Sequence, residues 1–548
     1  MLFEDLVSVF DELSKTTKRL EMAEILSAFF KKLKCEEIGF IVLLCMGKVF
    51  SSNSDKELGI ANNLMAEAIA LAGGSNKENV KKQWNIYGDI GETAKKFMTN
   101  KKQVSLVKKD LTLNDLKETL YKIPDITGKG SAGIKLKLVS NLLSMASPLG
   151  ALYLTRILIG SMRTGVGQGV VRDALAKAFN VKAENIEKSY NLCADYSKIA
   201  ETLCKNPDLI NNPKINLFSP INMMLFLKAN SVAEAFERVG RPARIEIKYD
   251  GLRAQIHKNG DKIMIFTRNL DNISLQFPDV VELVKKSVKP KSIIFECEIV
   301  GFNPENDKPL AFQFLSKRIK RKYEIEKIIK EIPVKLFCFD LLSLDDMDYL
   351  DEKFIDRHEA LKKSIIFNDK ILLAKGIITS NDMDAQKIFD EGIKEQEGVM
   401  FKSLISNYQA GARVGHGVKL KSHMKELDLV ITEAYYGKGK RKDWFGSYTL
   451  SCINTENGEF LTIGKLGTGF SDEQLEEMNK LVKEAVVKKE SEKVILEPKI
   501  VVEVEYEEIQ KSPTYASGYA LRFPRLLRIR YDKTPNEASD LAMIEQLK

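Results

Sequence analysis

The spacing of hydrophobic and polar residues changes twice along the chain. Up to about residue 215, hydrophobic residues recur every three or four positions, which predicts amphipathic helices. The clearest runs are 57–72, 134–145 and 151–162. The chain start fits the same pattern, because a helix there would place four hydrophobic side chains on one face: Phe3, Leu6, Phe10 and Leu13. We therefore expect an all-α domain over residues 1–215, which ends in a proline-bearing linker at 206–220.

From residue 243 hydrophobic and polar residues alternate, and alternation predicts strands. The expected strands are 243–249, 253–258, 262–268, 292–301, 334–344, 398–402 and 418–421. Asn259 and Gly260 separate the second strand from the third and predict a type I′ hairpin turn. The segment 216–424 is therefore expected to be an α+β domain built on antiparallel sheets.

Short strands return in the last part of the chain, and one helix interrupts them. The expected strands are 427–436, 447–454, 459–465 and 500–509. The helix is expected at 471–489, because Ser471 is a good N-cap and acidic and amide residues follow it. A small barrel of about five strands with one helix is typical of the OB-fold. We expect such a C-terminal β-barrel over residues 425–548.

Length and composition agree with a multidomain globular protein. A chain of 548 residues is too long for one hydrophobic core, and 44% hydrophobic with 29% charged residues is ordinary for a soluble chain. The longest apolar run, 38–46, falls short of the roughly 20 residues of a membrane span and fits a buried strand. The chain start lacks the features of a signal peptide. We expect no membrane partner and a cytoplasmic, nucleoid-associated location, or a nuclear one in a eukaryote.

The cysteines and histidines offer no metal site. No two of the seven cysteines stand in a Cys-x-x-Cys pair, and the four histidines do not repeat at metal-ligand spacing. An odd number of scattered cysteines supports neither a zinc site nor a disulfide framework. We expect reduced, mostly buried thiols at all seven positions: Cys35, Cys45, Cys193, Cys204, Cys297, Cys338 and Cys452.

The net charge of +8 permits a polyanionic partner but does not demand one. Local clusters are more informative than the total. One cluster comprises Arg522, Arg525, Arg528, Arg530 and Lys533, and another comprises Lys438, Lys440, Arg441 and Lys442.

The residues Glu246–Arg253 carry the strongest chemical pattern. In a strand, Glu246 and Lys248 lie on one face, and a turn at Gly251 would bring Arg253 back toward them. A lysine amine attacks phosphorus only in its neutral form, which a site rich in metal and basic residues favours. Taken alone, the tetrapeptide Lys-x-Asp-Gly fits a surface hairpin with mixed charges better than a reactive lysine.

Further motifs change that balance. Lys248–Arg253 resembles the first motif of the covalent nucleotidyltransferases, a superfamily of DNA ligases, RNA ligases and mRNA capping enzymes. The later motifs of that superfamily have similar counterparts here, in the same order: Thr267–Asn269, Phe295–Glu298, Phe337–Asp340, Glu397–Met400, Lys419–Lys421 and Arg522–Arg525.

Two further segments resemble one branch of this superfamily. Gly437–Arg441 and Gly464–Phe470 look like signatures of archaeal and eukaryotic replicative ATP-dependent DNA ligases, and the helical first third resembles their DNA-binding domain. The resemblance implies nick sealing in duplex DNA through a lysyl-AMP and a 5′-adenylated DNA intermediate, in replication, repair and recombination. It also implies ATP as AMP donor, Mg2+ as metal, nicked double-stranded DNA as partner, and a monomer.

The resemblance assigns roles by position. Lys248 would carry AMP, Glu246 would recognise the adenine edge, and Phe339 would stack on the ring. Contacts to phosphate or ribose are implied for Arg253, Arg268, Arg413, Lys419 and Lys421. Glu298 would contact ribose or metal, and Glu397 would contact metal. The resemblance implies DNA binding by Arg522 and Arg525.

Each role has a plainer alternative. Glu296 lies on the same strand face as Glu298, so one of the two is expected to do no chemistry. Phe339 could be ordinary core, and Arg413 and Lys421 could be rim charges. The histidines are expected to be bystanders: His257, His416 and His423. The segment His416–Val418 departs from the family, which often has an aromatic residue there, and puts details of the pocket in doubt.

Two glycine clusters resemble phosphate-binding loops only superficially. Gly165–Gly169 lacks the spacing of a dinucleotide fingerprint, and Gly128–Ser131 lacks the order of a P-loop. We expect both to present backbone N–H groups at helix N-termini to DNA phosphates, assisted by Arg163 and Lys129. The only hint of a sliding-clamp partner, Gln103–Leu106, lacks paired aromatic residues and fits a solvated loop better.

Two rival classes of function remain beside this interpretation. An RNA ligase or a capping guanylyltransferase would share the lysine chemistry, and labelled ATP or GTP, then nicked DNA or RNA, would separate them. A non-catalytic DNA-binding scaffold is disfavoured because no catalytic position of the family pattern is lost, and full sealing by Lys248→Ala would overturn the interpretation of Lys248. An NAD-dependent ligase is disfavoured because its zinc cysteines are absent.

Overall fold

The computed structural model describes residues 1–51, 54, 56–101, 110–319, 321, 323–421, 425–437, 444–490 and 492–547. The chain forms two compact units, Met1–Lys421 and Ser422–Lys548. The expected boundary at 424/425 lies close to their junction, and the one expected at 215/216 lies inside the first unit. Within these described ranges, no helix is both long and apolar enough to cross a membrane.

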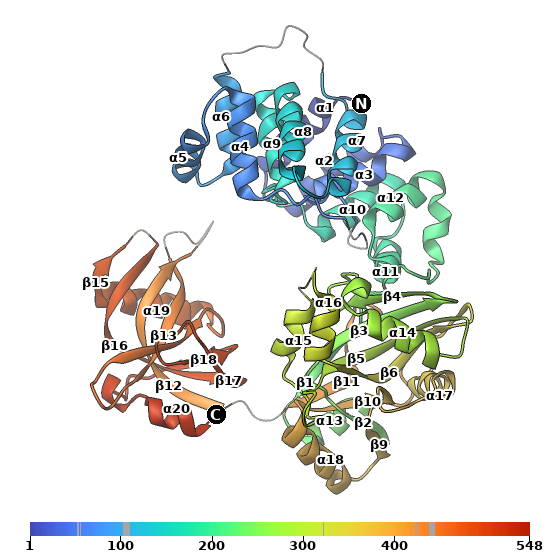
Figure 1. The fold of residues 1–548 in the computed structure, drawn as a ribbon, viewed down its shortest axis with the longest axis vertical. Helices are drawn as coiled ribbons and strands as arrows, with labels where there is room; N and C mark the ends of the chain where they lie inside the picture. The colour runs from blue at the N-terminus through green and yellow to red at the C-terminus, as the bar shows by residue number, and fades with distance from the viewer. Residues whose placement is uncertain are drawn as a thin grey trace. The chain divides into compact units, whose positions relative to one another are not determined.

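The first unit begins with a helical part, as the periodicity predicts (Figure 1). Its helices are α1 (Phe3–Ser14), α2 (Arg19–Phe30), α3 (Cys35–Cys45), α4 (Asn62–Gly73), α5 (Lys77–Tyr87), α6 (Ile90–Thr99), α7 (Leu113–Lys122), α8 (Ser131–Met145), α9 (Pro148–Leu158), α10 (Gln168–Phe179), α11 (Ala183–Cys193) and α12 (Tyr196–Lys205). The all-α prediction is confirmed.

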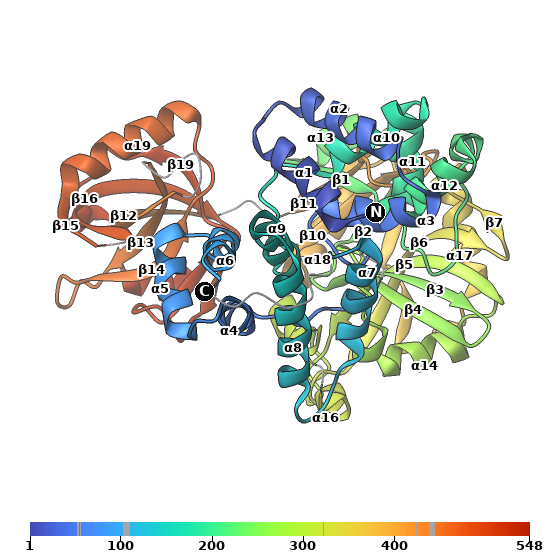
Figure 2. The same ribbon diagram turned by 90° about the horizontal axis from the view of Figure 1, so that it is seen from above.

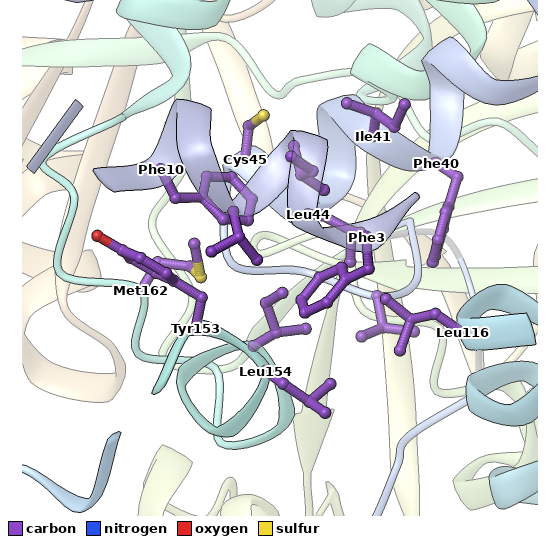
Figure 3. Close-up of a cluster of buried hydrophobic side chains, with 14 of the residues drawn as sticks. Phe3, Phe10, Phe40, Ile41, Leu44, Cys45, Leu116, Tyr153, Leu154 and Met162 are labelled. Carbon is purple, nitrogen blue, oxygen red and sulfur yellow. The ribbon is translucent and has the colours of Figure 1, made fainter. Parts of the chain in front are cut away.

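The core of this part forms around α1, α3 and α9 (Figure 3). The rings of Phe10 and Tyr153 lie 5.4 Å apart between centroids, and Phe3 and Leu44 are fully buried nearby. The strand predicted at 38–46 is wrong, because these residues form most of α3. A helix that is surrounded by other helices is apolar on every side, so its sequence has no helical period to detect.

A disulfide joins Cys35 at the start of α3 to Cys204 near the end of α12. The prediction that all seven cysteines are reduced is therefore wrong for these two. The bond connects residues 169 positions apart, and only the packing of α3 against α12 brings them together. Local spacing carries no trace of such a pair. The other five cysteines, Cys45 and Cys193 among them, are outside this disulfide.

The central part of the first unit contains two sheets, visible in Figures 1 and 2. The first has the order β1-β11-β10-β2-β9 and the second β4-β3-β5-β6-β7, with β8 beside β6. The strands are β1 (Leu225–Ala229), β2 (Ala243–Ile247), β3 (Leu252–Asn259), β4 (Lys262–Thr267), β5 (Ser292–Gly301), β6 (Val334–Leu344), β7 (Met347–Asp348), β8 (Ile371–Leu373), β9 (Gly376–Thr379), β10 (Gly398–Ser403) and β11 (Arg413–Lys421).

Helices cover these two sheets: α13 (Val232–Val239), α14 (Pro278–Ser287), α15 (Phe312–Ile319), α16 (Ile325–Glu331), α17 (Phe354–Ser364) and α18 (Asp382–Glu395). Most strand pairs are antiparallel, and β1–β11 and β6–β8 are parallel. The α+β prediction is confirmed. The sequence patterns missed only strands of two to five residues: β1, β7, β8 and β9. Such short strands offer too few alternations to detect.

The hairpin predicted between β3 and β4 is present, but its turn is not the predicted one. Asn259 still pairs with Lys262, so the two-residue loop is Gly260–Asp261. Within the loop only Gly260 has a positive φ, of 58°. A type I′ turn needs positive φ at both central residues, so that prediction is wrong.

The second unit is all-β apart from α19 (Asp472–Ala485) and α20 (Leu541–Leu547). Its strands are β12 (Lys425–Tyr436), β13 (Phe445–Ile453), β14 (Phe460–Leu466), β15 (Val486–Lys489), β16 (Lys493–Tyr506), β17 (Glu508–Lys511), β18 (Tyr519–Arg522) and β19 (Arg525–Ile529). The main sheet has the order β14-β13-β12-β16-β15, with β19 on β16. Ser471 caps α19 as predicted, but residues 486–489 form β15 instead of the predicted end of that helix.

Candidate active site

Lys248 lies directly after β2, and its backbone continues the pairing of β2 with β10. Its N–H donates to the carbonyl oxygen of Gly398 at 2.9 Å, and its own carbonyl accepts from the N–H of Glu397 at 3.1 Å. Gly398 has a φ of 130°, and a Cβ there would lie 2.3 Å from the carbonyl oxygen of Leu420. β10 and β11 approach so closely here that only glycine fits at position 398. The two backbone hydrogen bonds of Lys248 then place Glu397 beside it.

The amine of Lys248 forms an ion pair with Glu397. Lys421 Nζ lies 3.0 Å from the same carboxylate, so one anion is shared by two lysines. Burial would raise the pKa of Glu397, but the two lysines outweigh burial and lower this pKa to about 2. Glu397 is therefore a fixed anion at neutral pH, between the candidate nucleophile and Lys421.

Lys419 adds a third lysine to this face. In the pairing of β10 with β11, Lys421 lies opposite Gly398 and Lys419 lies opposite Met400. Burial lowers the pKa of Lys419, and the nearby charges of Lys248, Lys421, Arg268 and Arg413 lower it further. The predicted cations therefore gather around one point. Arg268 and Arg413 have exposed side chains and form the rim.

The second sheet contributes two glutamates with different surroundings. Glu296 is fully buried; it accepts from Arg253 Nη2 at 2.7 Å and from the hydroxyl of Tyr408 at 3.1 Å. Arg253 lies opposite Glu298 in the pairing of β3 with β5. Burial raises the pKa of Glu298 to about 8, although Lys248 and Arg253 act in the opposite direction. Glu296 thus belongs to the scaffold, and Glu298 is the glutamate near Lys248.

Glu246 and Phe339 meet through a residue that the sequence patterns did not single out, Lys402. Lys402 Nζ lies 2.6 Å from Glu246 Oε2 and 4.8 Å from the centroid of the Phe339 ring. Arg244 Nε donates to the other oxygen of Glu246 at 3.0 Å. The alternation along β10 could have indicated Lys402, because residues two apart on a strand share a face and Met400 lies opposite Glu246.

Arg268 also borders a polar cavity of about 550 Å3. The cavity lies between the end of β4 and the helical part of the same unit, where Lys48 and Arg172 are among its lining residues. The structure therefore brings Arg268 within range of Lys419 and, at the same time, of two cations from the helical part.

The departure at His416–Val418 has a structural counterpart. A Cβ on Gly417 would lie 2.4 Å from the ring of Phe226, which projects from the neighbouring strand β1. An aromatic ring from another strand therefore covers this position. His257 is fully buried, and burial lowers its pKa to about 3. Burial also lowers the pKa of His416.

The predicted DNA-binding residues lie outside this cluster. Both glycine clusters precede helices as expected: Gly130 comes directly before α8, and Gly167 is the N-cap of α10. Lys129 is exposed in the turn before α8. Arg163 Nη1 lies 3.0 Å from Asp89, so its charge is partly balanced within the chain.

In the second unit, Arg522 ends β18 and Arg525 begins β19. Arg522 lies 3.6 Å from Glu508, and Arg525 lies 3.8 Å from Glu505 on β16. The basic cluster is therefore accompanied by carboxylates of its own unit. Three predicted features fall outside the described residues: positions 438–442 of the lysine-rich cluster, which include most of the Gly437–Arg441 signature, the Gln103–Leu106 segment, and His423.

The arrangement as a whole suits chemistry on a phosphate. Three lysines and two rim arginines surround a point where negative charge would develop, and preorganised cations stabilise such charge best. The described residues contain no group of three or more His, Cys, Asp or Glu side chains that could hold a metal alone.

Three family patterns match the chain. The one described as "ATP dependent DNA ligase domain" matches residues 223–421, "DNA ligase N terminus" matches 2–176, and "ATP dependent DNA ligase C terminal region" matches 441–533.

The chain also resembles individual proteins over its full length. A protein named "DNA ligase" from Nanoarchaeum equitans is 41% identical over 557 residues, which cover 100% of this chain and 98% of the relative. Another "DNA ligase", from Thermococcus onnurineus, is 37% identical over 549 residues, with 100% and 98% covered. A solved structure titled "Pmar-Lig_Pre." is similar in fold, with a TM-score of 0.57 at 18% identity over 96% of this chain and 99% of that one.

Proposed function

The chain belongs to the ATP-dependent DNA ligase family, and from this premise we propose that it seals nicks in duplex DNA through an adenylate on Lys248. ATP as the AMP donor and DNA as the substrate follow from the family. The observation that carries the proposal for Lys248 is its position: one lysine amine, one fixed carboxylate and two further lysines meet at the junction of β2, β10 and β11.

In the first step, the neutral amine of Lys248 attacks the α-phosphorus of ATP. An N–P bond forms, the bond from that phosphorus to the bridging oxygen breaks, and pyrophosphate leaves while the nitrogen loses a proton. Phosphoryl transfer depends mainly on positioning and on cations that stabilise the spreading charge. Lys419 and Lys421 would do this on the phosphate oxygens, and Arg253, Arg268 and Arg413 would contact phosphate or ribose.

The base would be held between the two sheets. Phe339 offers a ring on which adenine would stack, and Glu246 offers an acceptor at the base edge. In the later steps, AMP moves from Lys248 to the 5′-phosphate at the nick, and the 3′-hydroxyl then displaces AMP to close the backbone.

Magnesium fits the carboxylates of this site. Mg2+ is commonly held by one or two carboxylates together with substrate phosphates, and Glu298 and Glu397 would supply the carboxylates here. When bound, the ion would neutralise phosphate charge.

DNA would be gripped mainly by its phosphates, since a nick has no fixed sequence. The proposed contacts are Lys129 directly before the N-cap of α8, Arg163 in the segment between α9 and α10, and Arg522 and Arg525 in the second unit. We include in the proposal action as a monomer in replication, repair and recombination.

The test is an intact-mass measurement after incubation with ATP and Mg2+. We expect the mass of one AMP on Lys248, which nicked DNA then discharges, and no adduct on Lys248→Ala. Lys375→Ala is the control, because this exposed lysine pairs with Glu391 on the surface and should leave the adduct unchanged. An adduct on Lys248→Ala, or none on the unmodified chain, would overturn the proposal.

A further inference from the structure

Lys402 is a buried cation that reaches the proposed base pocket from β10. In the pairing of β10 with β2 it lies opposite Arg244, while Met400 lies opposite Glu246. Its side chain is only 7% exposed. A buried ammonium persists only when it is paired, and here the partner is the carboxylate of Glu246 at 2.6 Å.

Glu246 is held from both sides. Its side chain is 2% exposed, Lys402 contacts one oxygen, and Arg244 donates to the other at 3.0 Å. Arg244 is fixed in turn, since its Nη2 donates to the carbonyl of Ala374 at 3.1 Å. A carboxylate between two cations accepts hydrogen bonds and donates none. Its orientation is set by these two contacts.

Lys402 also connects this acceptor to the stacking ring in the other sheet. Its Nζ donates to the carbonyl oxygen of Phe339 at 3.3 Å and lies 4.8 Å from the centre of the same ring. The side chain of Lys402 thus sets the position of Glu246 relative to Phe339. In the proposed complex Glu246 would contact the edge of the base and Phe339 its face.

A buried imidazole from α17 lies beside the same carboxylate. Nε2 of His358 lies 4.0 Å from Glu246 Oε1, and among the described residues neither ring nitrogen has a hydrogen-bond partner. At this distance the imidazole does not hydrogen-bond Glu246, so the contacts that fix the carboxylate are those of Lys402 and Arg244.

We propose that Lys402, supported by Arg244, is a positioning residue that makes the site specific for adenine. It holds Glu246 as a pure acceptor at the ring position where adenine carries an amine. Guanine carries a carbonyl oxygen at that position, so two acceptors would face each other and a buried acceptor would lose its partner. The inference rests on the proposed adenylate chemistry and deepens it.

The experiment compares ATP with a triphosphate of purine riboside, which lacks the amine, and with GTP. The rate of adduct formation on Lys248 is measured by intact mass over a range of nucleotide concentrations. For the unmodified chain, loss of the amine should lower kcat/KM by at least about tenfold, mostly through KM, because a hydrogen bond to a charged group is lost. In Lys402→Met the same loss should cost less than about twofold, and the preference for ATP over GTP should fall about tenfold.

Lys402→Arg should restore most of the preference. The matched control is Lys258→Met. Lys258 is another buried lysine of the central part; it lies near the end of β3 and donates to the carbonyl oxygen of Pro290. It should retain the full penalty for losing the amine.

The outcomes separate the claims. If Lys402→Met slows ATP and the analogue equally, Lys402 is only structural and the inference is overturned. If Lys402→Met does not fold, the unmodified chain and Lys402→Arg still decide. Equal rates with ATP and purine riboside triphosphate in the unmodified chain overturn the inference. A clearly lower rate with the analogue, in the unmodified chain and in Lys402→Arg alike, supports it. If no nucleotide labels the unmodified chain, the proposed function itself fails.

Discussion

Ion pairs between arginine and carboxylate occur in the central part of the first unit and in the second, C-terminal unit, but they differ in burial. In the centre, Arg357 is fully buried and binds both oxygens of Asp340, at 2.8 and 3.0 Å. In the C-terminal unit, Arg525 remains 55% exposed beside Glu505. The first kind of pair is locked because its charges cannot return to water. The second is screened by solvent and can exchange its partner.

This difference matches two tasks. The site around Lys248 must hold its charges in place before substrate arrives, because preorganisation is what lowers the barrier for phosphoryl transfer. Arginines that are to meet DNA phosphates must give up their own carboxylates to do so. Under the proposed function, burial in one region and exposure in the other would distinguish charges that shape the site from charges that meet DNA.

The largest expected effect comes from breaking a locked pair. Arg357→Met leaves Asp340 buried without its counterion, which should destabilise the central part by about 3–5 kcal/mol. Hydrogen exchange of the β5 and β6 amides measures this free energy locally. A loss below about 1 kcal/mol would place the pair in the same class as exposed surface pairs.

The pH dependence of this pair has a definite sign. Burial would raise the pKa of Asp340, but Arg357 outweighs burial and holds this pKa below its usual value. The contribution of the pair to stability is therefore complete above about pH 4, the ordinary aspartate value, and is lost as pH falls through the lowered pKa. The free energy of opening that exchange reports for β6 should show no change from this pair between pH 8 and 5. In Arg357→Met this loss at low pH should disappear, because the guanidinium that outweighs burial is gone, and the variant should instead lose stability as pH rises.

Next in size is the loss of a charge at the site itself. Lys421→Met removes one of two lysines on Glu397 and should slow formation of the AMP adduct by about 100- to 1000-fold, with unchanged stability of the helical part. Single-turnover mass spectrometry gives the rate. The control is Lys488→Met, an exposed lysine of the C-terminal unit that pairs with Glu490. A decrease below about tenfold would remove Lys421 from the proposed machinery.

How far the sequence predicts the site depends on the range of the contacts. Strands β5 and β6 have the predicted bounds, because runs of ten and eleven residues rich in strand-forming side chains are long enough to detect. Motif residues such as Lys419 and Lys421 meet Lys248 because strand pairing follows from the family pattern. Lys402 escaped notice because its role rests on an ion pair between β10 and β2, far apart in the chain.

The helical part shows the same limit from the other side. Helix α3 lacks a polar face, so its apolar run fits a strand as well as a buried helix. Its disulfide to α12 could not be inferred, because nothing local in the sequence distinguishes Cys35 and Cys204 from the other five cysteines. Both errors concern contacts that only the packed bundle creates.

A smaller effect is expected for that disulfide. Replacing both Cys35 and Cys204 by serine should destabilise the helical part by about 2–4 kcal/mol, because the unfolded chain is no longer closed into a long loop. Hydrogen exchange in α3 and α12 measures the change, and the rate of AMP labelling should be unaltered. Cys193→Ser, which alters a cysteine outside this disulfide at the end of α11, is the control. Equal exchange in all three proteins would mean that the bond adds nothing to stability.

The smallest expected change in stability comes from the exposed pair in the C-terminal unit. Arg525→Ala should leave the melting temperature unchanged, since water already screens the 3.8 Å contact with Glu505. If Arg525 exchanges this carboxylate for a phosphate, the slope of log affinity for nicked DNA against log salt should fall by about one. Arg238→Ala is the matched control, because Arg238 is also exposed and paired, with Glu234 in α13. A salt slope equal to that of the control would show that Arg525 does not meet DNA, and a lowered melting temperature would show that exposure does not make this pair dispensable.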